Sequence, residues 1–261
     1  MTTPLLALHG MLGTPAMFEA LLAPEYEPWL PGHGPDPDLS LHTFDAVADQ
    51  MERSLTERFG ATAVNVLGYS MGARFALAFC ARHPQRFRNA VLISGHPGLP
   101  SGDTQARAQR RHEDEANAIL IEREGLPALV QSWEQRPLFA SQADVPLSRR
   151  VAQRDARSAH RPEGIAYALR TFGLAEMPSY EEAILDHATR MAFVVGALDT
   201  KFVGIAQRLQ HTHPHLTVEI FPGVGHNVLF EAPALAARIA SLLHSASRHE
   251  PAAIACKEQS Q

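Results

Sequence analysis

Residues 66–74 read Val66-Leu67-Gly68-Tyr69-Ser70-Met71-Gly72-Ala73-Arg74, which places a G-x-S-x-G pentapeptide between an apolar run and an apolar helical segment. This context predicts a sharp strand-to-helix turn, because only residues of glycine size let the backbone fold so tightly around Ser70. The turn holds the hydroxyl of Ser70 over the sheet, and the first amides of the next helix can bind an oxyanion there. We therefore predict an enzyme that uses Ser70.

The wider pattern indicates an α/β fold. Short, nearly continuous apolar runs predict five buried strands, at 4–8, 63–68, 89–94, 191–196 and 216–221, and helical patterns occur at 43–59, 71–83 and 232–246. Alternating strands and helices indicate a mostly parallel sheet flanked by helices on both faces. Ligands bind such sheets beyond the carboxyl ends of the strands, where Ser70 falls.

A long insertion separates the third and fourth predicted strands. Residues 98–180 contain charged segments with helical character, at 105–124, 126–134 and 146–157, and we predict a helical cap over the mouth of the site. The core is then formed by residues 1–97 and 181–246. Residues 247–261 show no sustained periodicity and are predicted to be a disordered tail.

Composition limits the possible partners and the compartment. The net charge of −5 argues against binding to nucleic acid or to an anionic membrane surface. Two cysteines, Cys80 and Cys256, are too few for a disulfide framework, and no run approaches the length of a membrane span. The first residues lack the basic region of a signal peptide. We expect a cytoplasmic protein, and the sequence does not indicate an oligomeric state.

Two further residues complete a predicted catalytic set. Asp199 follows the apolar strand Phe193-Val194-Val195-Gly196, and His226 follows the next predicted strand in Gly223-Val224-Gly225-His226-Asn227. The order Ser, Asp, His is typical of the α/β-hydrolase fold. In this arrangement His226 moves protons and Asp199 fixes its tautomer.

The loop after the first strand, Leu8-His9-Gly10-Met11-Leu12-Gly13, can supply a backbone amide opposite Ser70. We predict that the N–H groups of Met11 and Met71 form the oxyanion hole. His9, and His33 in Leu30-Pro31-Gly32-His33-Gly34, are interpreted as structural residues. A metal site at His211, His213 and His215 would require a strand, but Pro214 lies among them with no carboxylate or cysteine nearby in sequence, so no metal is predicted.

Arg74 lies four residues after Ser70, on the same face of an apolar helix that is predicted to be buried. A buried arginine needs a partner, because an unpaired buried charge is costly. The partner is either a structural carboxylate or an anionic substrate beside Ser70. The chain also has 21 Arg residues against two Lys, a bias that either genomic composition or carboxylate recognition can explain.

At these residues the chain resembles the 2-succinyl-6-hydroxy-2,4-cyclohexadiene-1-carboxylate synthase family of menaquinone biosynthesis, over about residues 5–243. Beyond the pieces quoted above, the resemblance rests on Gly95-His96-Pro97-Gly98-Leu99, Arg110-Arg111 with Asp114, Trp133-Glu134-Gln135-Arg136-Pro137-Leu138-Phe139 and Asp199-Thr200-Lys201-Phe202. The chain departs from the family at Met11, where Phe is common, and at Asn117-Ala118, where an aromatic residue is common.

The resemblance implies an α/β-hydrolase fold with a catalytic triad of Ser70, Asp199 and His226. It further implies substrate-binding roles for Arg74, Arg110, Arg154, Tyr69, Trp133 and Lys201. The implied reaction is a 2,5-elimination of pyruvate from a small polyanionic carboxylate, with Ser70 as the base. It requires neither a metal nor an organic cofactor.

Two other functions are compatible with the same residues. An esterase or C–C bond hydrolase would use the triad through an acyl-enzyme and would have no need of Arg74. A ligand receptor or interaction module could retain the fold without catalysis, although an intact Ser, Asp and His set argues against it.

Overall fold

The computed structural model describes residues 3–245, so the predicted tail at 247–261 lies outside the described residues. A five-stranded sheet forms its centre, and the strands follow one another in space as they do in the chain. The strands are β1 (Leu5–Leu8), β2 (Val64–Tyr69), β3 (Phe87–Ile93), β4 (Met191–Gly196) and β5 (Thr217–Phe221), and all neighbours are parallel. The predicted fold class is confirmed, and each strand lies within two residues of its predicted range.

Helices cover both faces of the sheet, which is why β1 to β4 read as nearly unbroken apolar runs. The prediction of a buried strand is wrong for β5, which lies at the edge of the sheet and has no buried residue. Alternate residues of β1 point to opposite faces. Leu6 and Leu8 pack with α2 (Phe44–Phe59), α3 (Met71–Arg82), α8 (Glu181–His187) and α9 (Thr200–Thr212). Leu5 and Ala7 pack on the other face with α11 (Ala236–Ser245) and the short α1 (Glu19–Leu22).

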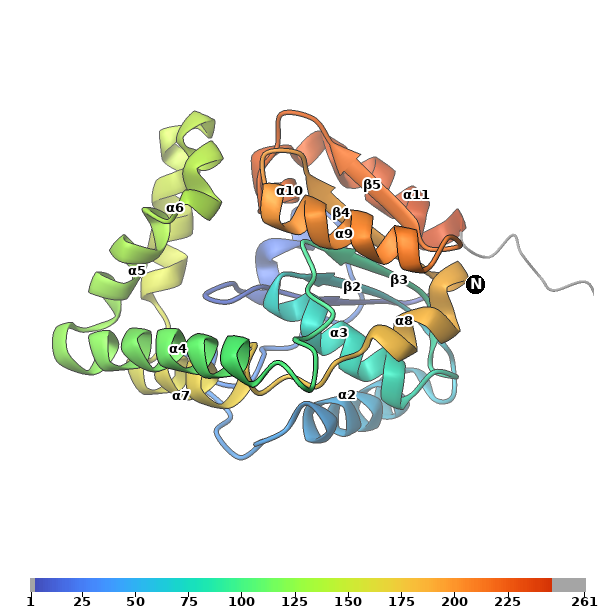
Figure 1. Ribbon diagram of the computed structural model, residues 1–261, viewed down its shortest axis with the longest axis horizontal. Helices are drawn as coiled ribbons and strands as arrows, with labels where there is room; N and C mark the ends of the chain where they lie inside the picture. The colour runs from blue at the N-terminus through green and yellow to red at the C-terminus, as the bar shows by residue number, and fades with distance from the viewer. Residues whose placement is uncertain (1–2, 246–261) are drawn as a thin grey trace, which may run out of the picture.

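The insertion between β3 and β4 carries four helices beside the sheet, on the left in Figure 1. They are α4 (Thr104–Glu124), α5 (Leu126–Glu134), α6 (Leu147–Ser158) and α7 (Pro162–Phe172), with the 3-10 segment η2 (Pro137–Asp144) between α5 and α6. We call these elements the cap. The cap has its own apolar core, and Leu12 from the loop after β1 packs into it. The cap therefore contacts the loop that is predicted to supply Met11.

The predicted helix at 232–246 is too long at its N-terminal end. The chain instead forms the short helix α10 (Val228–Glu231), a 3-10 turn at Pro233–Leu235 and then α11. Pro233 explains the interruption, because it lacks an amide hydrogen and disfavours helical geometry at the residue before it. Ala232 accordingly has φ −134° and ψ 77°.

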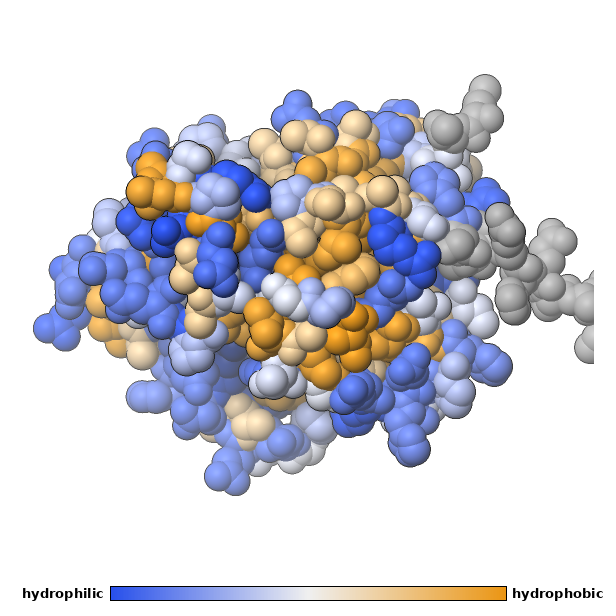
Figure 2. Space-filling view, turned by 90° about the horizontal axis from the view of Figure 1, so that it is seen from above, coloured by the Kyte–Doolittle hydropathy of each residue, from blue (hydrophilic) through white to orange (hydrophobic). Residues whose placement is uncertain are grey.

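The face that carries α6 and α10 is amphipathic. Figure 2 shows hydrophobic side chains gathered in the middle of this face, with hydrophilic side chains around them. Within residues 3–245, no helix combines the length and the apolar character needed to span a bilayer.

Candidate active site

Ser70 is the single residue between β2 and α3. Its backbone has φ 53° and ψ −107°, a conformation that residues other than glycine rarely adopt and that is held only by the surrounding structure. A side chain at Gly68 would approach the Cα atom of Ala73 to 2.6 Å, and one at Gly72 would overlap the carbonyl oxygen of Leu8. The two glycines of the pentapeptide are thus needed for α3 to begin directly against β1 and β2.

Ser70, His226 and Asp199 form a continuous hydrogen-bonded chain. The Nε2 atom of His226 lies 3.0 Å from Oγ of Ser70, and Nδ1 lies 2.6 Å from Oδ2 of Asp199. Since the carboxylate accepts a hydrogen bond from Nδ1–H, Nε2 carries no proton and can accept the proton of the Ser70 hydroxyl. The other oxygen of Asp199 caps α9 by accepting the amide of Phe202 at 3.3 Å, which fixes the carboxylate.

The loop that carries His226 is held by two side chains that the sequence did not single out. The hydroxyl of Ser94, at the end of β3, donates to the carbonyl oxygen of His226 at 2.7 Å. The carboxylate of Glu231 accepts hydrogen bonds from the backbone amides of Gly225 at 2.6 Å and Asn227 at 3.2 Å, the residues on either side of His226. These bonds fix the backbone of His226 before any ligand binds.

The amides predicted for the oxyanion hole come from two elements near Ser70. Met71 is the first residue of α3, so its amide has no partner within the helix. Met11 lies on the loop after β1, where a side chain at Gly10 would approach the ring of Tyr69 to 2.7 Å. The glycine therefore lets this loop lie against the residue that precedes Ser70.

His33 and His9 support this loop. Nε2 of His33 accepts the amide of Leu12 at 3.2 Å, and Nε2 of His9 accepts the amide of Leu30 at the same distance. Burial lowers the pKa of His9 to about 4 and holds the pKa of His33 well below its usual value. Both rings are therefore neutral at pH 7 and act as hydrogen-bond acceptors for the backbone.

Ser70 opens into a cavity of about 470 Å³ between the sheet domain and the cap. Of the residues predicted for the site, Met11, Tyr69, Ser70 and Trp133 line it. Most of the remaining lining is apolar, including Met17, Leu21, Phe139, Leu229 and Phe230. Among the described residues that line it, Arg149 and Arg157 are charged and none is acidic. The cavity is therefore suited to a molecule with an apolar body and a negative charge.

Three aromatic rings surround the imidazole of His226. The ring centroids of Phe202, Tyr69 and Phe139 lie 4.7, 5.5 and 5.7 Å from that of His226. Phe139 comes from the cap, so the cap completes the enclosure of the histidine. An enclosure of this kind limits the access of water and strengthens electrostatic interactions inside the site.

Arg74 is buried as predicted, but its partner is not a carboxylate. Its Nη1 atom donates to the carbonyl oxygen of Phe172, at the end of α7, at 2.8 Å. The adjacent Arg110 is held by Asp114 through two hydrogen bonds of 2.8 Å. Burial, together with the charge of Arg110, lowers the pKa of Arg74, and Asp114 opposes this shift. The charge of Arg74 is thus only partly balanced.

Three predicted residues gather around His96 rather than in the lining of the Ser70 cavity. Burial, together with positive charges nearby that include Lys201, Arg74 and Arg110, lowers the pKa of His96 to about 3. The ring of Phe202 separates this cationic cluster from the triad, with centroids 6.4 Å from His96 and 4.7 Å from His226. The cationic cluster around His96 therefore lies on the α9 side of His226, beyond the ring of Phe202.

Arg154, which the resemblance assigns to the substrate, does not line the Ser70 cavity. Its side chain is 59% exposed and donates to Glu134 at 2.8 and 2.5 Å. Arg157, one turn later on α6, does line the cavity, and it is buried and donates to the other oxygen of Glu134 at 3.1 Å. The cap arginines that line the Ser70 cavity are thus Arg149 and Arg157, and not Arg154.

The three alternating histidines do not lie on one face of a strand. His211 is in the last turn of α9, His213 follows that helix as its C-cap, and His215 is exposed. Within residues 3–245, no group of three or more His, Cys, Asp or Glu residues has an arrangement that could hold a metal ion.

Known proteins resemble this chain in both sequence and structure. The family described as alpha/beta hydrolase fold matches residues 3–233. Putative 2-succinyl-6-hydroxy-2,4-cyclohexadiene-1-carboxylate synthase of Bacillus subtilis is 35% identical over 179 residues, which cover 68% of this chain and 64% of that protein. The synthase of the same name from Salmonella paratyphi C is 31% identical over 78% of this chain and 77% of its own. The structure of MenH from S. aureus superposes with a TM-score of 0.85 at 26% identity, covering 94% of this chain and 96% of that one.

Proposed function

Because this chain belongs to the 2-succinyl-6-hydroxy-2,4-cyclohexadiene-1-carboxylate synthase family, on the α/β-hydrolase fold, we propose that it is a lyase of menaquinone biosynthesis. Its substrate would be 2-succinyl-5-enolpyruvyl-6-hydroxy-3-cyclohexene-1-carboxylate, from which it eliminates pyruvate. The observation that carries the proposal is the series of hydrogen bonds from Ser70 through His226 to Asp199. Ser70 faces a cavity whose charged lining residues are arginines. The compartment we propose is the cytoplasm.

In the proposed reaction the triad supplies a base. Nε2 of His226 takes the hydroxyl proton of Ser70 across 3.0 Å, and the alkoxide of Ser70 removes a proton from the ring side of the substrate. The electron pair of that C–H bond moves through the ring and breaks the C–O bond to the enolpyruvyl group. The leaving enolate takes up a proton and becomes pyruvate.

The negative charge that develops on the substrate needs fixed positive partners. The amides of Met11 and Met71 would serve as the oxyanion hole near Ser70. Arg157 lies in the same cavity, and Arg74, Arg110 and Lys201 gather on the far side of Phe202. A substrate with several carboxylates would contact both sets of positive side chains. A neutral ester would need neither set.

The deciding experiment is an assay of the purified protein for pyruvate release from the enolpyruvyl substrate. Release that depends on enzyme concentration and yields the cyclohexadiene product supports the lyase. If the protein instead hydrolyses neutral p-nitrophenyl esters and releases no pyruvate, the triad belongs to an esterase. If neither substrate is consumed, the fold serves a binding role.

A further inference from the structure

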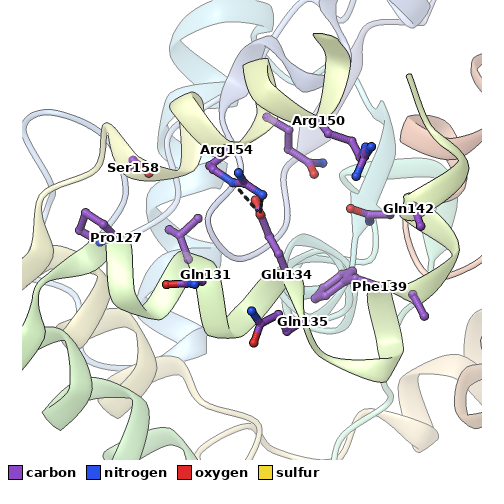
Figure 3. A pocket seen from close by; sticks show the side chains of 13 residues that line it. Pro127, Gln131, Glu134, Gln135, Phe139, Gln142, Arg150, Arg154 and Ser158 are labelled. Atoms are coloured by element: carbon purple, nitrogen blue, oxygen red, sulfur yellow. Dashed lines mark hydrogen bonds and ion pairs between the residues drawn. The ribbon is translucent and has the colours of Figure 1, made fainter. Parts of the chain in front are cut away.

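A second cavity, of about 630 Å³, lies within the cap between α5, η2 and α6 (Figure 3). It shares the lining residues Phe139 and Gln153 with the Ser70 cavity, but Ser70, Tyr69 and Arg157 do not line it. No role in the proposed elimination requires it.

Helix α6 presents one face to each cavity. Arg150, Arg154 and Ser158, spaced four residues apart, line the cap cavity. Arg149 and Arg157 line the Ser70 cavity. Residues four apart lie on the same face of a helix, so Arg150, Arg154 and Ser158 share one face. Arg149 and Arg157 lie on the neighbouring face and point in a different direction. The cap cavity is therefore a structural feature distinct from the active site.

The cap cavity carries excess positive charge. Arg154 is paired with Glu134, whose carboxylate is also shared with Arg157. Arg150 donates its Nε proton to the carbonyl oxygen of Val145 at 3.0 Å, and it forms no ion pair with any residue between 3 and 245. Two arginines four residues apart on a helix repel each other, so an anion between them and the cavity wall would be stabilised.

The wall of the same cavity holds a buried donor without a partner among the described residues. Gln142 is only 6% exposed, and its Nε2 atom has no hydrogen-bond partner among the described residues. Figure 3 shows its side chain extending from η2 into the cavity toward Arg150. A buried donor left unsatisfied is costly, and an acceptor placed between Gln142 and Arg150 would remove that cost.

The remaining wall is apolar. Phe139, Val130 and Pro127 contribute ring and aliphatic surface, and Ala140 and Ala143 leave room beside them. We propose that the cap cavity binds a small organic monocarboxylate. Its carboxylate accepts hydrogen bonds from Gln142 and Arg150, and its hydrocarbon body packs against Phe139 and Val130. The site is distinct from the triad and does not depend on the proposed lyase activity.

Benzoate is a suitable probe, with benzamide as its neutral isostere. Titration into 15N-labelled protein, followed by NMR, should shift the side-chain amide signal of Gln142, which is identified by its absence in Gln142→Leu. Benzoate should bind at least about tenfold more tightly than benzamide, because a charge-assisted bond to arginine is lost in the amide. Gln142→Leu and Arg150→Ala should each weaken benzoate binding by about tenfold or more.

Arg149→Ala is the matched control, since it removes an arginine from the other face of the same helix. It should leave benzoate binding unchanged. The proposal is overturned if benzoate binding is lost in Arg157→Ala but retained in Arg150→Ala, because benzoate would then occupy the Ser70 cavity. It is also overturned if benzamide binds as well as benzoate, or if benzoate gives no saturable shift.

Discussion

The Nε2 atom of His226 lies 3.0 Å from Oγ of Ser70, although 156 residues separate the two in the chain. The sheet brings them together. Ser70 directly follows β2 and His226 lies in the loop after β5, and because all strands are parallel, both loops leave the sheet at the same edge. The cap then encloses the pair.

Ser70→Ala removes the proposed base without adding volume. We expect pyruvate release to fall by several powers of ten, as in other enzymes that lose one member of a triad. The fold should persist, because the strained backbone at Ser70 is held by Gly68, by Gly72 and by the hydrogen bond that the amide of Ser70 donates to the carbonyl oxygen of Ile93 at 2.8 Å. Pyruvate release measured beside a circular dichroism spectrum tests this. Near-normal release by the variant would contradict the mechanism.

Asp199→Asn tests the orientation of the histidine. An amide cannot fix Nδ1–H across 2.6 Å as a carboxylate does, so the tautomer of His226 changes and the rate should fall by about 10⁴-fold. His226→Ala should cost at least as much. The matched control is Asp155→Asn, which replaces an exposed carboxylate on α6. Retention of most activity in either triad variant would require a different base.

The strands and the candidate triad could be predicted from the sequence because each leaves a local pattern. Buried parallel strands are continuous apolar runs, and the turn at Ser70 needs glycines at fixed positions. Asp199 and His226 each follow a strand, and the parallel sheet then brings both to one edge. Their proximity thus follows from topology, with no need to know the side-chain packing.

The lining of the cavity could not be predicted in the same way. Arg154 and Arg157 are three residues apart, and which of them faces Ser70 depends on how α6 packs against α5 through Glu134. Sequence spacing places both on the helix but does not fix its rotation. Ser94 and Glu231 were missed for a similar reason, since a hydrogen bond to a distant backbone leaves no motif.

The buried histidines predict a loss of stability in mild acid. The pKa of His9 is about 4 in the folded protein and about 6.5 in the unfolded chain, so between these values the unfolded chain binds more protons. The free energy of unfolding should therefore fall as pH drops below about 6.5. The part due to His9 reaches on the order of 3 kcal/mol near pH 4. Denaturant unfolding at several pH values measures this slope.

His9→Gln removes the titrating group and should reduce the slope, even if it also lowers stability at pH 7. His211→Gln, at an exposed position on α9, is the control and should leave the slope unchanged. An equal slope in the wild type and in His9→Gln would show that carboxylates, and not the buried histidine, cause the loss in acid.

Arg157 and Arg154 offer the sharpest test of how the substrate is held. Arg157→Ala should lower kcat/KM on the enolpyruvyl substrate by about 10- to 150-fold, the cost of losing roughly 1.5–3 kcal/mol of charge-assisted hydrogen bonding. Arg154→Ala should cost less than about threefold, because it removes an exposed ion pair outside the Ser70 cavity. Arg74→Ala and Arg110→Ala should resemble Arg157→Ala if the cationic cluster also binds carboxylates.

Lysine replacement and a neutral substrate separate substrate binding from support of the fold. Arg157→Lys should recover only part of the loss, because lysine keeps the charge but not the planar guanidinium. Any hydrolysis of a neutral ester should fall far less than pyruvate release in Arg157→Ala, since that ester has no carboxylate to hold. Equal losses on both substrates would mean that Arg157 supports the cap through Glu134. A larger loss for Arg154→Ala than for Arg157→Ala would place the substrate carboxylate on the other face of α6.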